Sequence, residues 1–244
     1  MSAVAKEIFA SGYTFAIDGA RLPTSSHISL EEGSALHDLI RTNPSVTRTL
    51  EIGCAQGVSS LFICEALQDR PTALHNIIDP FQYRNWKGAG IAALQRANLH
   101  NFRLIEERSE FALPELLKQG SVFDLVFIDG WHTLDHTLLD AFYAVRLLRI
   151  GGFLVIDDTE MPPIMKAVAY LRNYPCLRIH KQIYTWPEHD LTRFLCAVGS
   201  MIPVTPNMRF RAHKKLQKLL RAPSMIILAK ESEDQRKWNW YRPF

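Results

Sequence analysis

The stretch RTLEIGCAQG at residues 48–57 decides the fold, because it joins a short strand to a helix through a glycine turn. Residues 48–52 read as the strand and residues 59–68 as the helix that follows. Gly53 and Gly57 lie between them, where glycine lets the backbone turn tightly and approach a ligand closely. Their Gly-x-x-x-Gly spacing differs from the Gly-x-Gly-x-x-Gly of dinucleotide-binding turns, which disfavours a pyrophosphate site.

Strands and helices alternate beyond this turn. Further strands are predicted at residues 74–79, 102–106, 123–129 and 152–157, and further helices at residues 86–99, 110–119, 134–148 and 164–172. After residue 175, two more strands are predicted at 176–183 and 225–229, with a long helical or irregular insertion between them. The pattern predicts an α/β fold whose doubly wound, mostly parallel sheet is covered by helices on both faces.

The composition indicates one soluble globular domain. Of the 244 residues, 47% are hydrophobic and 22% are charged, as in ordinary globular proteins. The net charge of +3 is too small to indicate a nucleic-acid partner. Residues 208–221 carry three Arg and three Lys with no acid, which indicates a basic helix face or, less favoured, a site for an anionic partner.

The sequence also favours a location in the cytoplasm. Cys54, Cys64, Cys176 and Cys196 form no CxxC pair, which is typical of free thiols in a reducing compartment. The N-terminal stretch MSAVAKEIFA has no apolar run like that of a secretory signal. No stretch reaches the roughly 18 apolar residues that a membrane span needs, so no membrane partner is expected.

Asp79 is a candidate ribose ligand. It ends the second strand, 22 residues beyond Gly57, and an acid at that place can accept both ribose hydroxyls. Alternatively, Gly53 and Gly57 are ordinary turn glycines and Asp79 caps the strand end before Pro80. Either feature alone favours that alternative, but the two together, in order and on the expected elements, favour a nucleoside site without a diphosphate.

These motifs resemble those of class I methyltransferases that use S-adenosylmethionine. The Glu51-x-Gly53-x-x-x-Gly57 turn resembles their first motif, residues 78–81 (IDPF) their ribose motif, and residues 108–110 (RSE) their adenine loop. The resemblance covers about residues 45–175. It is strongest to small-molecule O-methyltransferases, which include catechol O-methyltransferase and macrolide-sugar O-methyltransferases.

The resemblance implies a Rossmann-like, seven-stranded sheet with one antiparallel edge strand. It implies that Glu51 lies toward the amino group of the cofactor and that the turn contacts its methionine part. It also implies that Asp79 contacts the ribose, and that Ser109 and Glu110 contact the adenine. The residues expected to contact the cofactor are Glu51, Gly53, Cys54, Ala55, Gly57, Asp79, Pro80, Phe81, Ser109, Glu110 and Asp129.

The whole chain is expected to form one methyltransferase domain. Residues 1–45 would form an N-terminal helical cap, residues 46–175 the cofactor-binding core, and residues 176–244 the terminal strands with a helical insertion. The cap and the insertion at 186–222 are expected to cover the pocket and to select a small-molecule acceptor. A homodimer is left open, since related small O-methyltransferases often pair.

Three aspartates are predicted at the reaction end of the sheet. Asp129 follows one buried strand, and Asp157 and Asp158 follow another. If these strands are neighbours, their ends lie about 4.8 Å apart, and the carboxylates would repel one another unless a cation lies between them. Oxygen ligands suit Mg²⁺ or another hard divalent cation. Alternatively, Asp157 or Asp158 caps a helix that begins near Pro162.

His132, together with Asp129, is the predicted catalytic group. A neutral hydroxyl is a poor nucleophile and needs a base or a metal ion to lower its pKa, and a histidine three residues beyond Asp129 can serve as that base. In the catechol O-methyltransferase type, metal ligands lie at these two strand ends, with an asparagine in place of Asp158 and a lysine base in place of His132. Alternatively, His132 hydrogen-bonds a loop carbonyl. Asp135 and Asp140 are expected on the solvated side of the next helix.

The leading hypothesis is a metal-assisted O-methyltransferase that acts on a small-molecule hydroxyl, such as that of a sugar or natural product. A second hypothesis is a metal-independent methyltransferase in which His132 alone is the base. A third is a non-catalytic cofactor-binding protein, and a nicotinamide-dependent oxidoreductase is the weakest alternative.

Overall fold

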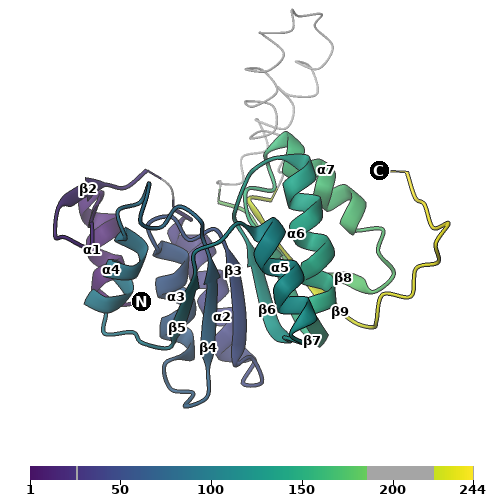
Figure 1. Cartoon of the computed structure of the whole chain (residues 1–244), viewed down its shortest axis with the longest axis horizontal. Helices are drawn as coiled ribbons and strands as arrows, with labels where there is room; N and C mark the ends of the chain where they lie inside the picture. Colours follow the sequence, from purple (N-terminus) through teal and green to yellow (C-terminus); the bar gives the residue numbers. More distant parts are fainter. Residues whose placement is uncertain (26, 186–222, 244) are drawn as a thin grey trace, which may run out of the picture.

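The core of the molecule is a seven-stranded sheet (Figure 1) in the order β5-β4-β3-β6-β7-β9-β8. The computed structural model of the chain describes residues 1–25, 27–185 and 223–243. The strands of this sheet are β3 (Arg48–Ile52), β4 (Leu74–Ile78), β5 (Phe102–Ile105), β6 (Phe123–Ile128), β7 (Leu148–Ile156), β8 (Leu177–Ile183) and β9 (Met225–Lys230).

The strand directions confirm the predicted mixed sheet. The four pairs from β5 to β7 are parallel, whereas β9 runs antiparallel to both β7 and β8. The antiparallel strand therefore lies one place inside the β8 edge. In this order β3 and β6 are central neighbours, and their ends lie beside each other at the carboxyl edge of the sheet.

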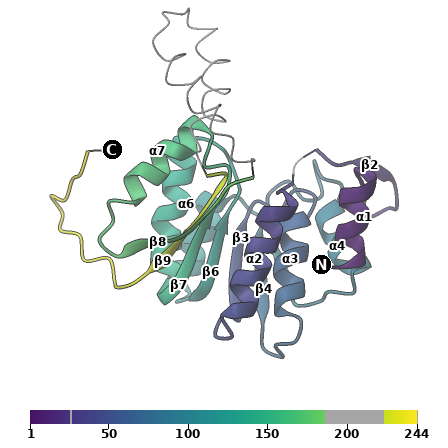
Figure 2. The ribbon, with the colours of Figure 1, turned by 180° about the vertical axis from the view of Figure 1, so that it is seen from behind.

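Helices cover both faces of the sheet, as the alternating pattern predicts. Helices α5, α6 and α7 lie in front in Figure 1, and α2 and α3 lie in front when the molecule is turned around in Figure 2. Each face has its own buried apolar cluster. The helices are α1 (Ala3–Ser11), α2 (Leu30–Thr42), α3 (Val58–Leu67), α4 (Ala89–Arg96), α5 (Ser109–Lys118), α6 (Leu134–Leu147) and α7 (Pro162–Leu171).

Local signals explain where two of these helices begin. Ser29 and Glu32 form a capping box at the start of α2, with the serine side chain accepting from the Glu32 N–H and the Glu32 side chain accepting from the Ser29 N–H. Helix α4 is shorter than predicted because Gly88, at φ +70°, lies in the left-handed region immediately before it. The turns that precede Gly88 therefore do not extend the helix.

The N-terminal segment contains more structure than the sequence analysis predicts. Helix α1 is followed by a two-stranded antiparallel sheet of β1 (Tyr13–Phe15) and β2 (Arg21–Pro23). The segment contacts the glycine turn through Gln56, whose side chain donates to the Pro23 carbonyl and accepts from the Ser25 N–H. Strands of three residues are too short to give a clear alternating pattern.

The C-terminal tail packs partly on the domain. Trp240 lies edge-on against Tyr170 and Tyr174, whereas Trp238 is 97% exposed. The predicted insertion at 186–222, with the basic residues 208–221, lies outside the described residues. None of the helices in the described ranges combines the length and apolar character that crossing a bilayer requires.

Candidate active site

A cavity of about 470 Å³ opens at the carboxyl ends of β3, β4 and β6, where open α/β sheets bind their ligands. Its volume suits a small-molecule ligand. The predicted site residues that line it are Gly53, Ala55, Asp79, Pro80, Phe81, Ser109, Glu110, Asp129 and His132. Glu51, Cys54 and Gly57 are not among the lining residues.

Asp79 fixes the conformation of the glycine turn. The backbone N–H groups of Cys54 and Ala55 donate to its Oδ2 atom over 3.2 and 2.8 Å, and that of Phe81 donates to Oδ1 over 2.8 Å. Burial raises the pKa of Asp79, and the three backbone donors oppose that shift. Since a carboxylate oxygen can accept two hydrogen bonds, Oδ1 keeps an acceptor position for a ribose hydroxyl.

The two glycines of the turn have different structural tasks. Gly53 has φ +88°, and a Cβ there would overlap the carbonyl oxygen of Asp129. Gly57 has φ +81°, and a Cβ there would lie 2.6 Å from the Cα of Gly90, at the start of α4. Gly53 therefore brings the turn against the end of β6, whereas Gly57 allows close packing of α3 on α4, outside the cavity.

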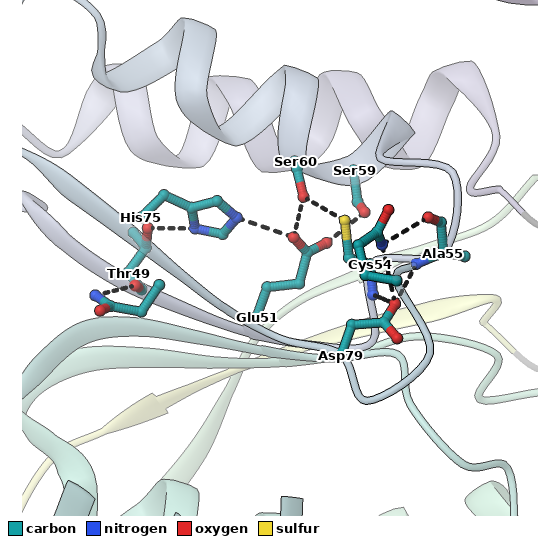
Figure 3. A network of polar contacts seen from close by, with 10 residues as sticks. Thr49, Glu51, Cys54, Ala55, Ser59, Ser60, His75 and Asp79 are labelled. Atoms are coloured by element: carbon teal, nitrogen blue, oxygen red, sulfur yellow. Dashed lines mark hydrogen bonds and ion pairs between the residues drawn. The ribbon is translucent and has the colours of Figure 1, made fainter. Parts of the chain in front are cut away.

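Glu51 lies behind the turn, where its carboxylate is bonded within the protein. Figure 3 shows it pointing toward the hydroxyls of Ser59 and Ser60, both of which donate to it, with His75 beside it. Nε2 of His75 lies 2.9 Å from Glu51 Oε2. Because side chains alternate along a strand, Glu51 faces away from the cavity that Ile52 lines. The motif implies that Glu51 lies toward the amino group of the cofactor. This arrangement does not place the Glu51 carboxylate in direct contact with that group.

The start of α5 forms another wall of the cavity, with Ser109 and Glu110 on its surface. Behind them lies Asp140, which hydrogen-bonds Ser109 and is 1% exposed. The prediction that Asp140 faces solvent was wrong, because α6 packs that side against α5. Burial raises the pKa of Asp140 to about 6. Asp135, on the same helix, is exposed as predicted.

Aromatic residues lie around the cavity mouth. Phe81, Trp86 and Trp131 line it, and Trp131 is 61% exposed with its ring 6.4 Å from that of Phe81. His136, one turn into α6, also lines the cavity and lies near Trp131. No role is predicted for His136 from the sequence, because nothing in its local sequence distinguishes it from a surface histidine.

Asp129, His132 and Asp158 come together at one side of the cavity. Strands β6 and β7 are neighbours, with Ile128 paired to Ile156, so the residues that follow them meet. One ligand atom from each of the three side chains lies within 4.8 Å of the others. Nε2 of His132 lies 3.3 Å from Asp129 Oδ1 and 2.9 Å from Asp158 Oδ2. The partners of His132 are therefore carboxylates and not a loop carbonyl.

The three side chains form a compact donor group. The hydrogen bonds to Asp129 and Asp158 raise the pKa of His132 to about 10. Burial raises the pKa of Asp129, which the hydrogen bond from His132 opposes. Asp158 has φ +53°, an uncommon conformation for a residue other than glycine. That backbone turn aims its carboxylate at His132.

Asp157 does not join the compact group, contrary to the predicted metal set. It is 6% exposed, and its Oδ1 atom has no hydrogen-bond partner among the described residues. Burial and the charge of Asp129 raise its pKa. The left-handed backbone at Asp158 directs its carboxylate to His132, whereas Asp157 lies outside the group of ligand atoms within 4.8 Å. Neither caps α7, because Met161 is the N-cap residue and no side chain caps that helix.

Comparison with known proteins places this architecture in a family. Residues 50–159 match the family model described as a methyltransferase domain. Residues 50–159 form a methyltransferase domain. The matched segment begins in β3 and ends just beyond β7, so it contains the glycine turn, Asp79 and the Asp129–His132–Asp158 group. The chain is accordingly a methyltransferase.

Solved structures share the fold of this methyltransferase. The O-methyltransferase TomG from Streptomyces achromogenes, involved in tomaymycin synthesis and solved with S-adenosylmethionine, is 20% identical; the alignment covers 84% of this chain and 81% of TomG, with a TM-score of 0.59. The O-methyltransferase from Bacillus cereus in complex with S-adenosylhomocysteine is 14% identical over 94% of this chain and 91% of that chain, with a TM-score of 0.63. At these identities the likeness establishes the fold. No curated protein sequence matches the chain.

Proposed function

We propose that this methyltransferase transfers the methyl group of S-adenosylmethionine to a hydroxyl oxygen of a small molecule. The observation that carries the proposal is that Asp129 and His132 line the same cavity as Asp79. The predicted cofactor-binding groups and the predicted acid–base groups therefore share one volume. TomG and the Bacillus cereus protein, which have this fold, are described as O-methyltransferases.

The reaction requires one bond to form as another breaks. The acceptor oxygen attacks the methyl carbon, the carbon–sulfur bond breaks, and the hydroxyl proton goes to a base. The products are a methyl ether and S-adenosylhomocysteine. Asp79 would bind the ribose and Ser109 and Glu110 would contact the adenine, so that the methyl group faces the Asp129–His132–Asp158 group. Orientation of this kind contributes much of the rate enhancement in bimolecular reactions.

The Asp129–His132–Asp158 group also suits a divalent metal ion. Two carboxylates and an imidazole within 4.8 Å supply both oxygen and nitrogen ligands. Carboxylates alone would favour Mg²⁺ or Ca²⁺, whereas the imidazole moves the preference toward Mn²⁺ and its first-row neighbours. When bound, such an ion would lower the pKa of an acceptor hydroxyl. Asp129, His132 and Asp158 are the residues that would hold it.

One observation favours a second candidate, a metal-independent methyltransferase. The His132 side chain already lies between two carboxylates, so its positive charge can balance theirs without another cation. The sequence predicts His132 as the base of such an enzyme, but a positively charged His132 has no free position for a proton. In that case Asp129, a buried carboxylate that hydrogen-bonds His132, would accept the hydroxyl proton. The two candidates share the cofactor and the cavity and differ only in what balances the charge of Asp129 and Asp158.

The test separates cofactor binding, metal binding and turnover. Purified protein is treated with a chelator and titrated with Mn²⁺ in the presence of S-adenosylhomocysteine, with calorimetry as the readout. Turnover on a panel of sugars, catechols and aliphatic alcohols is then measured with and without Mn²⁺. Restoration of activity by Mn²⁺ supports the metal-assisted reaction, and full activity after chelation supports the second candidate. Binding of S-adenosylhomocysteine without methyl transfer to any hydroxyl in the panel, but with transfer to amines, would overturn O-methylation.

A further inference from the structure

A buried network of hydrogen bonds lies directly behind the glycine turn that follows β3 (Figure 3). Glu51, on β3, accepts from Ser59 and Ser60 in the first turn of α3 and is 2.9 Å from Nε2 of His75, on β4. The side chains of Glu51 and His75 are fully buried. An ionised carboxylate only accepts hydrogen bonds, and all three of its partners can donate. This network therefore provides a complete set of hydrogen-bond donors for a charged Glu51.

The hydrogen bond at the other end of this network, between His75 and Thr49, indicates the protonation state of His75. Nδ1 of His75 lies 2.8 Å from the hydroxyl of Thr49, which is itself buried. If the imidazole is neutral, the Thr49 hydroxyl donates to Nδ1 and the Nε2–H donates to Glu51, so every group has a partner. If both ring nitrogens carried protons, the Thr49 hydroxyl would have to accept, and its own proton would lack an acceptor among the described contacts. A neutral His75 leaves a net negative charge on Glu51.

The charge of Glu51 affects the pKa values of titratable groups around the cavity. The Glu51 carboxylate is among the groups that raise the pKa values of Asp79, at the predicted ribose end, and of Asp129, at the reaction end. Burial raises the pKa of Cys54, in the turn itself, and the Glu51 charge adds to that shift. Arg108 is a cation on the cavity wall, but its side chain is 61% exposed, so solvent screens it more strongly. A buried charge acts through a lower effective dielectric.

The negative charge of Glu51 can distinguish the cofactor from its product, because the two differ in charge. S-adenosylmethionine carries a positive sulfonium, and its product S-adenosylhomocysteine carries a neutral thioether in the same scaffold. We propose that Glu51, oriented by His75, is an internal counter-charge that makes the cavity prefer the sulfonium cofactor to its neutral product. The inference rests on the proposed cofactor site and adds a positioning role for His75. Its consequence is easier release of the product after each turnover.

The variant Glu51→Gln tests the charge with little change in side-chain volume. A unit charge on the order of 10 Å away, at an effective dielectric of about 20, changes the affinity for a cation roughly tenfold. Glu51→Gln is therefore expected to weaken S-adenosylmethionine binding about tenfold by calorimetry, and to change S-adenosylhomocysteine binding by less than about twofold. An equal loss for both ligands would show a purely structural role and overturn the proposal, as would an unchanged ratio.

Three further variants make the test specific. His75→Gln keeps an N–H donor near Nε2 and should preserve the affinity ratio, whereas His75→Leu should lower it. Asp124→Asn is the matched control, because Asp124 is also a largely buried carboxylate that accepts backbone N–H groups, but it lies at the other end of β6. Its substitution should leave the ratio unchanged, and a shift as large as that of Glu51→Gln would overturn the proposal.

A double variant tests the same affinity ratio if Glu51→Gln fails to fold. Replacement of both side chains by apolar ones, Glu51→Met with His75→Leu, leaves neither the carboxylate nor the imidazole without the other, and the same ratio is then measured. If the wild-type chain binds neither ligand, the proposed cofactor site itself is wrong and this inference fails with it. If the wild type binds both and the double variant keeps the wild-type ratio, only the counter-charge is overturned.

Discussion

The Nε2 atom of His132 lies 2.9 Å from Oδ2 of Asp158, a residue whose backbone is held at φ +53°. Strained conformations of this kind gather at functional sites, where the surrounding structure maintains them. Here the turn beyond β7 uses that conformation to bring a second carboxylate to the histidine that Asp129 already contacts. The contact ties the loops after β6 and β7 into one reactive group.

Substitution of Asp158 by Ala should weaken Mn²⁺ binding at least tenfold, because it removes one of three donors that lie within 4.8 Å of one another. Binding of S-adenosylhomocysteine should stay close to that of the wild type, since Asp158 is not among the residues that line the cavity. Calorimetry with each ligand measures both effects. Undiminished Mn²⁺ affinity in this variant would remove Asp158 from the proposed metal site.

Substitution of Gly53 by Ala should destabilise the protein and weaken cofactor binding. The left-handed backbone costs about 1–2 kcal/mol for a residue with a Cβ, and that Cβ would also overlap the Asp129 carbonyl. We therefore expect a loss of more than about 2 kcal/mol in the free energy of unfolding, measured by urea denaturation. Gly120→Ala is the matched control, because Gly120 has φ +68° and nothing lies within 4 Å of its Cβ position. A loss no larger than that of Gly120→Ala would mean that the backbone contact is dispensable.

Asp140 should make the protein less stable as the pH rises from about 4 to 6. Its pKa of about 6 in the folded chain lies above the ordinary value of 3.8. In this window the unfolded chain loses the proton and the folded chain keeps it, so the free energy of unfolding falls, by up to about 3 kcal/mol. Asp140→Asn should reduce the fall by that amount in denaturation measurements across the range, with the part due to the other buried aspartates remaining. Asp135→Asn, on the exposed side of α6, should retain the whole fall.

The two tryptophans of the C-terminal tail should differ in their effect on stability. Trp240→Ala should lower the free energy of unfolding by about 2 kcal/mol, because its ring packs against Tyr170 and Tyr174. Trp238→Ala should change it by less than about 0.5 kcal/mol, since that side chain is 97% exposed. Thermal or urea unfolding of both variants checks the prediction. Equal effects would mean that the tail does not pack as described.

The sequence predicts the sheet well because its strands and helices are long and distinct. The buried runs of β6 and β7, the turn after β3 and Asp79 after β4 all lie where the pattern places them. Most of the predicted cofactor residues that follow a strand, such as Asp79 and Pro80, line the cavity, whereas Cys54 and Gly57 do not. The predicted seven strands form one sheet because alternating elements can bury both faces only in that way.

Side-chain direction is what the sequence analysis could not provide. Glu51 and Asp157 occupy the expected positions in the chain, but neither side chain lines the cavity. His75 and Asp140 acquire their environments from residues far away in the sequence, Glu51 and Ser109 respectively. Such partners depend on strand register and helix packing, which no local motif encodes.

The backbone contact between Gly53 and Asp129 has a consequence for redesign. It joins the half of the sheet that would hold the nucleoside, β3 to β5, to the half that carries the reactive group, β6 and β7. A change that shifts β6 would therefore disturb both halves at once. Altering which molecule is methylated is best attempted in the loops beyond Gly130 and Asp158, with the strand ends themselves kept as they are.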